Sequence, residues 1–278
     1  MNLNWFESML YGLFSGLTDI LPVSAQAHKA MMLKIFGTSG NMDLMNLLIH
    51  FAIAAALYIN CRSHLVRMNR ASRLARIPKK KRKRPLDLRS MMDLSMLKTI
   101  LVPAFIGLLL YRQGSKMHGN LMLLAVFLFL NGVILYVPQF LPSGNRDSRT
   151  LSRVEGLLMG LGGTVSVIPG ISAIGTSTAI ASVCGVERSY GLNMALMMQL
   201  FLTAGLMVYD VIGIINNRLG TLSVLNLLRY VFAAAIAFCS SMAAIKLMRR
   251  LAAGDGYSVF AFYCFGLALF TFIFNLMA

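Results

Sequence analysis

Long apolar runs constrain this chain more than any other feature of its sequence. A helix of roughly 20 apolar residues crosses a hydrocarbon core about 30 Å thick. Six runs of about this length lie near 44–60, 95–112, 119–138, 190–214, 223–247 and 257–277. Because 57% of the residues are hydrophobic and only 13% are charged, the chain cannot cover the surface of a soluble protein. Lipid leaves open strand edges unpaired, so the sequence predicts an all-α polytopic membrane protein with about six transmembrane helices.

Two further apolar stretches, 5–36 and 153–186, are interrupted halfway by Pro22 and by Pro169-Gly170. Each half is too short to cross a bilayer. Proline removes a backbone donor and clashes with the preceding turn, while glycine tolerates a sharp bend. A broken backbone at membrane depth is tolerated only where it is buried in protein or lines a wet cavity. We therefore expect two re-entrant helical hairpins.

Each hairpin is followed by three full spans, so a single integral membrane domain, 1–278, divides into two similar repeats, 1–138 and 153–278. An odd number of spans between the hairpins makes this an inverted repeat. Corresponding interrupted segments indicate a binding site near the membrane midplane. The hairpins also share a glycine spacing before the break: Gly12 and Gly16, then Gly156 and Gly160. This spacing is equally typical of close helix packing, and both interpretations can hold together.

Positive charge gathers in one loop. The formal net charge is +16, and 12 of the 26 Lys and Arg lie between Arg62 and Arg89, including the unbroken basic run 79–84. Such a run can bind nucleic acid. In a chain this apolar it favours a cytoplasmic loop, 61–94, that follows the positive-inside rule and contacts anionic lipid heads. We therefore expect no nucleic-acid partner, and both termini outside.

The first hairpin carries two ionisable residues, Asp19 and His28. Ionisable side chains inside membrane segments are costly and mark functional sites by default. A carboxylate can hold Mg²⁺ or Ca²⁺ beside phosphate oxygens, and a histidine can move a proton near neutral pH. A helix-end cap for Asp19 and an interfacial position for His28 are the structural alternatives.

Small and hydroxyl side chains surround the second break, in the run Pro169-Gly-Ile-Ser-Ala-Ile-Gly-Thr176. Backbone N–H groups and hydroxyls near a Pro-Gly break can hold phosphate, helped by the N-terminus of the following helix. The candidate phosphate-binding residues are Gly170, Ser172, Gly175, Thr176 and, from the first hairpin, Lys29. For Lys29 the alternative is a side chain that reaches out to the membrane interface.

The run Gly16-Leu-Thr-Asp-Ile-Leu-Pro-Val-Ser-x-x-x-His28 resembles the motif Gly-Leu-Thr-Glu-Phe-Leu-Pro-Val-Ser-Ser-x-x-His of the undecaprenyl pyrophosphate phosphatase, or bacitracin-resistance, family. Pro169-Gly-Ile-Ser-Ala-Ile-Gly175 is similar to that family's Pro-Gly-x-Ser-Arg-Ser-Gly. The resemblance extends to the segment 43–50 with Arg62, and to 257–263, so it covers nearly the whole chain.

This resemblance implies six spans, two re-entrant hairpins, and metal-dependent hydrolysis of undecaprenyl pyrophosphate to the monophosphate. The cofactor would be Mg²⁺ or Ca²⁺, held by Asp19, and the catalytic residues would be Asp19, Ser24 and His28. Such a hydrolase recycles the lipid carrier of peptidoglycan synthesis in the bacterial inner (cytoplasmic) membrane. The expected partners are the polyprenyl pyrophosphate and anionic lipids, and a homodimer is left open.

Several positions depart from the family pattern. Ser15 and Ala25 replace a glutamate and a serine, and Asp19 is a shortened glutamate. Ala173 and Ile174 replace an arginine and a serine. Phosphoryl transfer depends on cations that neutralise the transferred group, and the loss of one such donor commonly costs ~10²–10³-fold in rate. Two hypotheses follow: an active phosphatase with a rearranged site, or a catalytically impaired relative that transports a polyprenyl phosphate or another lipid.

Overall fold

The computed structural model describes residues 3–38, 42–82, 84–115, 117, 119–217, 223–253 and 258–277. Regular structure within these residues is helical, apart from an isolated bridge between Arg146 and Val186. The α-helices are α1 (Trp5–Thr18), α2 (Ala25–Ile35), α3 (Asp43–Ala75), α4 (Leu88–Ser115), α5 (Leu121–Tyr136), α6 (Arg153–Val165), α7 (Ala173–Val183), α8 (Arg188–Asn217), α9 (Val224–Ala253) and α10 (Ser258–Met277). Two short 3-10 helices are η1 (Lys79–Lys81) and η2 (Val137–Phe140).

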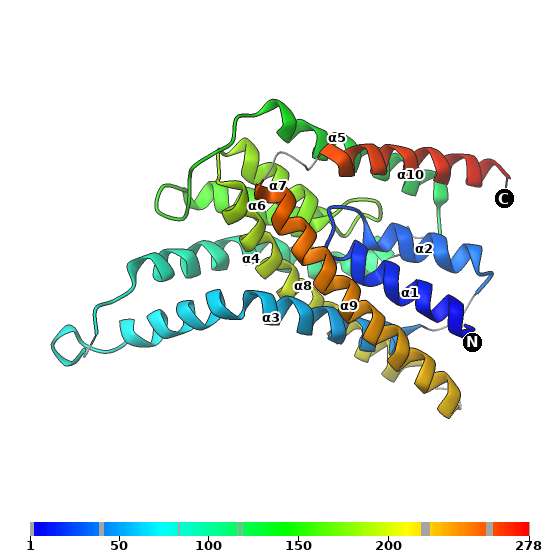
Figure 1. The fold of residues 1–278 in the computed structure, drawn as a ribbon, viewed down its shortest axis with the longest axis horizontal. Coiled ribbons are helices and arrows are strands. Elements are labelled where there is room, and N and C mark those ends of the chain that lie inside the picture. The colour runs from blue at the N-terminus through cyan, green and yellow to red at the C-terminus, as the bar shows by residue number, and fades with distance from the viewer. Residues whose placement is uncertain are drawn as a thin grey trace.

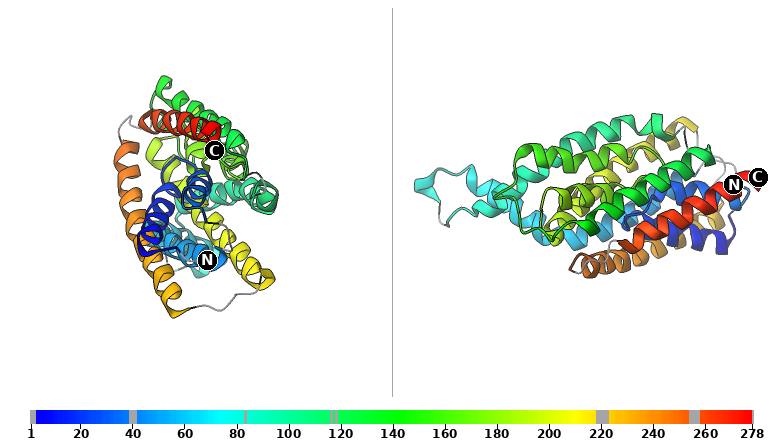
Figure 2. Two further views of the ribbon diagram at one scale, coloured as in Figure 1. Left: turned by 90° about the vertical axis from the view of Figure 1, so that its right-hand side faces the viewer. Right: turned by 90° about the horizontal axis from the view of Figure 1, so that it is seen from above.

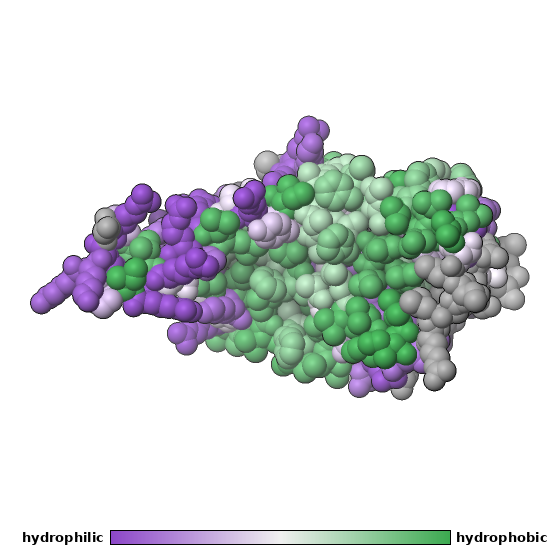
Figure 3. All heavy atoms as spheres, turned by 90° about the horizontal axis from the view of Figure 1, so that it is seen from below, coloured by the Kyte–Doolittle hydropathy of each residue, from purple (hydrophilic) through white to green (hydrophobic). Residues whose placement is uncertain are grey.

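Six helices are long and apolar enough to cross a membrane: α3, α4, α5 together with η2, α8, α9 and α10. They coincide with the six apolar runs of the sequence, so the all-α architecture with six spans is confirmed and the chain is a multi-pass membrane protein. The space-filling view shows a broad hydrophobic belt, with hydrophilic side chains gathered beyond it at one end (Figure 3). Tyr257, at the start of the last predicted span, lies outside the described residues.

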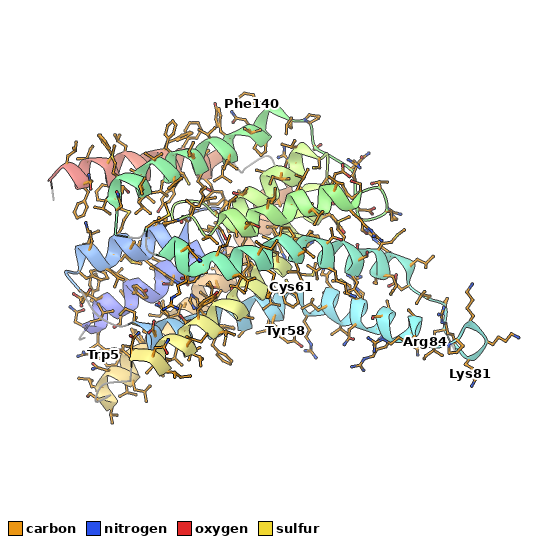
Figure 4. All side chains as sticks on the ribbon, turned by 180° about the vertical axis from the view of Figure 1, so that it is seen from behind. Trp5, Tyr58, Cys61, Lys81, Arg84 and Phe140 are labelled. Carbon is orange, nitrogen blue, oxygen red and sulfur yellow. The ribbon has the colours of Figure 1, made fainter. Side chains whose placement is uncertain are left out.

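α3 extends well beyond the span that it contains. Its 33 residues make a helix about 50 Å long at about 1.5 Å per residue. The predicted loop 61–94 is therefore largely helical, and only 76–87 connect α3 to α4. The helix continues beyond the apolar run because Arg, Leu and Ala are good helix formers, and extending an existing helix is cheap. The end of α3, the start of α4 and the residues between them form a basic protrusion, and Lys81 and Arg84 lie at its tip (Figure 4).

Both predicted breaks separate two short helices. Pro22 lies in the segment 19–24 between α1 and α2, and Pro169 lies in the segment 166–172 between α6 and α7. Gly170 has φ +111°, a backbone conformation that residues with a Cβ rarely adopt. The structure thus has two helical hairpins where the sequence predicts them.

The two hairpins pack against the long helices in the same way. α1 lies along α9 and α6 lies along α4, while α3 packs on α8 and α5 on α10 (Figure 1). A Cβ added at Gly16 would overlap the backbone of Ala237, and one added at Gly160 would overlap that of Ile100. The shared glycine spacing therefore serves close helix packing in both repeats. Their re-entrant, inverted placement in a bilayer remains a prediction.

The hairpins open toward opposite ends of the molecule. At the open end of the first, Arg229 donates a hydrogen bond to the carbonyl oxygen of Leu3 (3.1 Å). At the open end of the second, Ser148 donates to Asp93 Oδ1 near the start of α4 (2.5 Å). The basic loop lies at this second end, whereas the start of α1 and the end of α10 lie at the other (Figures 1 and 2).

Candidate functional site

A cavity of about 550 Å³ lies where the tips of the two hairpins meet. The first hairpin contributes Asp19, Ser24 and Lys29 to its wall, and the second contributes Ser172. Helices α3, α4 and α8 complete it with His50, Gly107, Leu108, Tyr111, Gln199, Leu202, Leu206 and Asp210. The wall also includes Gly37, Thr38 and Gly119, so the cavity reaches toward the end of the molecule opposite the basic loop.

Two helices begin at this cavity. Ser24 is the N-cap of α2 and accepts a hydrogen bond from the amide of Ala27 (3.3 Å). Ser172 is the N-cap of α7 and accepts from the amide of Gly175 (3.2 Å). Neither helix has an acidic residue in its first turn. The positive ends of two helix dipoles therefore converge on the cavity, an arrangement that favours an anion.

Buried hydrogen bonds hold the two tips together. The amide of Gly170 donates to Ser24 Oγ (2.9 Å). Asn131 of α5 bridges both breaks, because its side-chain amide donates to the carbonyl oxygen of Pro22 (3.1 Å) and its side-chain oxygen accepts from the amide of Ser172 (2.9 Å). Asn131 is fully buried. The relative position of the hairpin tips is thus fixed by groups that water cannot reach.

The cavity wall carries a chain of four ionisable side chains. Lys29 Nζ lies 3.6 Å from Asp19 Oδ2 and 3.1 Å from His50 Nε2. His50 Nδ1 lies 2.6 Å from Asp210 Oδ2. Asp19, His50 and Asp210 are buried, and the Lys29 side chain retains only 16% of its exposure. Among the described residues, no donor completes a hydrogen bond to Asp19 Oδ2.

The Lys29 side chain lines the cavity and pairs with the carboxylate of Asp19. It lies in the cavity with Asp19, Ser24 and Ser172, so the structure brings these four predicted site residues together. Asp19 is also the C-cap residue of α1, which fits the structural alternative for its backbone, although its carboxylate faces Lys29.

His28 lies outside the cavity lining. Its Nδ1 donates to the carbonyl oxygen of Ser24 (2.7 Å), its Nε2 accepts from the hydroxyl of Tyr263 (2.7 Å), and its ring stacks between Phe14 and Tyr263. Successive residues of a helix point about 100° apart, so Lys29 and the preceding His28 face different neighbours. His28 therefore does not share the cavity wall with Asp19 and Ser24, and its side chain is buried at 5% exposure.

The other predicted phosphate-binding residues form the packing behind the cavity. A Cβ added at Gly170 would overlap Phe127, and one added at Gly175 would make tight contacts with Leu135 and Pro22. Thr176 is buried, and its hydroxyl has no hydrogen-bond partner among the described residues. None of the three lines the cavity.

The positions that depart from the family pattern divide into two groups. Ala25, Ala173 and Ile174 line the cavity, so the family side chains that they replace belong to its wall. Ser15 is fully buried on α1 and does not line it.

Sequence reasoning missed His50, Asp210 and Asn131. A signal was present for the first two, because both are ionisable residues within predicted spans, and such residues mark functional sites by default. Nothing in the sequence around Asn131 distinguishes it from other polar residues of a span.

The residues present fit a divalent cation poorly. In the described part of the chain, no group of three or more His, Cys, Asp or Glu side chains could hold a metal ion. The one carboxylate assigned to the metal, Asp19, is already paired with the Lys29 ammonium. A cation bound to Asp19 would lie close to this like charge, which is unfavourable at short range. The arrangement therefore gives no support to the expected Mg²⁺ or Ca²⁺.

An apolar groove adjoins the polar cavity. It has a volume of about 560 Å³, lies between α4 and α8, and shares Leu108 and Leu202 with the cavity wall. Its rim exposes Phe105, Leu109, Val208 and Ile212, which in a six-span protein face lipid. The polar cavity and the apolar groove therefore share part of one wall.

Comparison with known proteins agrees with the motif resemblance. Residues 8–270 match the family described as bacitracin resistance protein BacA. An undecaprenyl-diphosphatase of Methanobrevibacter smithii is 27% identical over 273 residues, which is 96% of each chain. One of Methanococcus maripaludis is 24% identical over 269 residues, 96% of this chain and 99% of the relative. Undecaprenyl-diphosphatase 1 of Shouchella clausii is 23% identical over 275 residues, 97% and 96% of the two chains.

Proposed function

We propose that this chain, which belongs to the bacitracin resistance protein BacA family, binds a polyprenyl pyrophosphate in the membrane and hydrolyses it slowly to the monophosphate. The observation that carries the proposal is the junction of a polar cavity, where the two hairpin tips meet, with an apolar groove at Leu108 and Leu202. The expected substrate is undecaprenyl pyrophosphate, the substrate named for the relatives.

The polar end suits a pyrophosphate head. The N-termini of α2 and α7 point at the same space, and the hydroxyls of Ser24 and Ser172 lie in its wall. Lys29 and Lys34, which also line it, supply positive charge. Half-helix N-termini that face an anion at a repeat interface are a recurring arrangement in membrane proteins.

The apolar end suits a polyisoprenoid chain. Each methylene removed from water contributes about 0.8 kcal/mol, but a chain already in lipid gains mainly from close packing against the groove wall. The groove therefore contributes to specificity for the chain more than to the total affinity.

Slow turnover follows from what the cavity lacks. Ala173 and Ala25 present only methyl groups where the family pattern has an arginine and a hydroxyl. His28 is committed to Ser24 and Tyr263 and does not face the ligand space. Positioned cations and a general base each contribute large factors to phosphoryl transfer, so their loss lowers the rate more than the affinity.

The test is phosphate release from undecaprenyl pyrophosphate by the purified full-length protein, together with equilibrium binding of the same lipid. We expect binding with slow release, both weakened by Lys29→Met. Binding with no release under any metal condition would favour the transport hypothesis, which a lipid-translocation assay in liposomes then tests. No binding at all would remove the proposed function.

The relatives come from archaea and from a bacterium. The proposed location is therefore the cytoplasmic membrane of a prokaryote, without assignment to bacteria.

A further inference from the structure

The chain of ionisable side chains in the cavity joins two consecutive helices to a third, which lies 160 residues later in the sequence. Lys29 comes from α2, His50 from α3 and Asp210 from α8. Buried charges are costly unless they are paired and hydrogen-bonded. Each of these groups has a partner of complementary character, so the arrangement forms one unit.

The contacts fix the protonation pattern of His50. An ammonium group can only donate, so His50 Nε2 accepts from Lys29 Nζ at 3.1 Å. Nδ1 must then carry the imidazole proton and donate it to Asp210 Oδ2 at 2.6 Å. A carboxylate that holds the far nitrogen of a histidine sets both the tautomer and the orientation of the ring. Asp210 therefore acts on Lys29 through His50.

The ammonium group of Lys29 keeps a donor for a ligand. One N–H of the ammonium donates to His50 Nε2, a second is left for the 3.6 Å ion pair with Asp19, which is too long for a hydrogen bond, and an ammonium has three. Because Lys29 lines the cavity, the third can reach a phosphate oxygen there. Ala173, in the same wall, leaves the position of the family arginine without a charge.

We propose that His50 and Asp210 are positioning residues that hold Lys29 as the pyrophosphate-binding cation of this site, so that binding requires no divalent metal. The inference rests on the proposed function. In the family pattern the phosphate-binding charge is an arginine of the second hairpin, and here it is Lys29 of the first. It also accounts for the poor fit of the cavity to a metal ion, because the ammonium occupies the position next to Asp19.

The experiment measures the Kd for undecaprenyl pyrophosphate with the purified full-length protein, in excess EDTA and in Mg²⁺. We expect the two Kd values of the wild type to agree within about threefold. Lys29→Met should weaken binding more than about tenfold, and Lys29→Arg should retain part of it. Lys98→Met, an exposed lysine of α4 that lines neither the cavity nor the apolar groove, is the matched control and should change Kd little.

A double-mutant cycle separates positioning from a general structural role. Asp210→Asn should weaken binding about tenfold in the wild type. It should have no further effect in the Lys29→Met background, because Asp210 acts on the ligand only through His50 and the Lys29 ammonium. His50→Gln keeps an acceptor near the place of Nε2, so it should bind better than His50→Asn. Thermal unfolding of each variant checks that it is folded.

The outcomes are separable. A wild type that binds only with Mg²⁺, or a Lys29→Met variant that binds normally, overturns the inference and leaves the proposed function intact. If Asp210→Asn still weakens binding in the Lys29→Met background, Asp210 has a general structural role and does not position Lys29. A wild type that binds in neither condition removes the proposed function, and this inference with it.

Discussion

The side-chain amide of Asn131 donates a hydrogen bond to the carbonyl oxygen of Pro22, 3.1 Å away and 109 residues earlier in the chain. The other atom of the same carboxamide accepts from the amide of Ser172. A single buried side chain on α5 therefore satisfies backbone groups of both hairpin breaks, which have lost their helical partners. Broken backbone inside a membrane needs such partners.

Replacing Asn131 with Leu should destabilise the protein and disorder the cavity. Two buried backbone groups lose their partners, and an unsatisfied buried group costs about 1–3 kcal/mol. Thermal unfolding in detergent should show a clear drop in Tm, together with weaker lipid binding. The matched control is Leu130→Ala, at a neighbouring lipid-facing position. An Asn131→Leu variant as stable as this control would contradict the bridging role.

Filling the groove between α4 and α8 should select against long polyprenyl chains. A Cβ at Gly205 would overlap the side chain of Leu108, so Gly205→Leu narrows the groove where it meets the cavity. Binding of undecaprenyl pyrophosphate should weaken several-fold, since the displaced part of the chain loses its close packing against the groove wall. Binding of geranyl pyrophosphate should be unchanged.

Ala235→Leu is the control for this variant, because it adds similar bulk at an exposed position of α9 away from the groove. Equal losses for the long and the short lipid in Gly205→Leu would show that the groove does not hold the chain.

An arginine introduced in the second hairpin should take over the role of Lys29 as the phosphate-binding cation. Ala173 lies in the cavity wall at the position of the family arginine. Ala173→Arg should therefore recover much of the binding that Lys29→Met removes, because a guanidinium binds phosphate through paired N–H groups. The measurement is the Kd of the double variant against that of Lys29→Met. No recovery in a folded double variant would argue against a shared phosphate position.

Restoring the family glutamate at Ser15 should have a different effect. Ser15 is fully buried and does not line the cavity, so Ser15→Glu would place a charge where no ligand can reach it. The variant should lose stability without gaining phosphate release. Increased phosphate release from a stable Ser15→Glu protein would show that the side of α1 that carries residue 15 faces the cavity during turnover.

The orientation in the membrane follows from the basic protrusion. The positive-inside rule places the end of α3 in the cytoplasm and the α8–α9 connection outside. In a cysteine-free background, an impermeant thiol reagent added outside should label Asn216→Cys and not Asn69→Cys, both exposed positions. The reverse pattern would invert the topology and the side on which the cavity opens.

Local signals predicted much of the fold. Apolar run length located the six spans, and Pro22 and Pro169 located the hairpin breaks, because proline acts on its immediate neighbours. The sequence does not predict which neighbours each side chain of a hairpin faces. His28 and Lys29 are adjacent in sequence, and only the packing of α2 against its neighbours decides which of them enters the cavity. The partners of Asn131 depend on contacts between distant segments, which no local pattern encodes.

The length of α3 has an electrostatic consequence. Helix continues for fourteen residues after Cys61, to Ala75, and carries the tip about 20 Å farther along its axis. Attraction between exposed charges fades over about 8 Å at physiological ionic strength. Arg62 and Arg67, near the base, can therefore respond to the surface potential of an anionic bilayer. Lys81, at the tip, lies beyond that range, so we expect the protrusion to act on an anionic bilayer through the charges near its base and not through those at its tip.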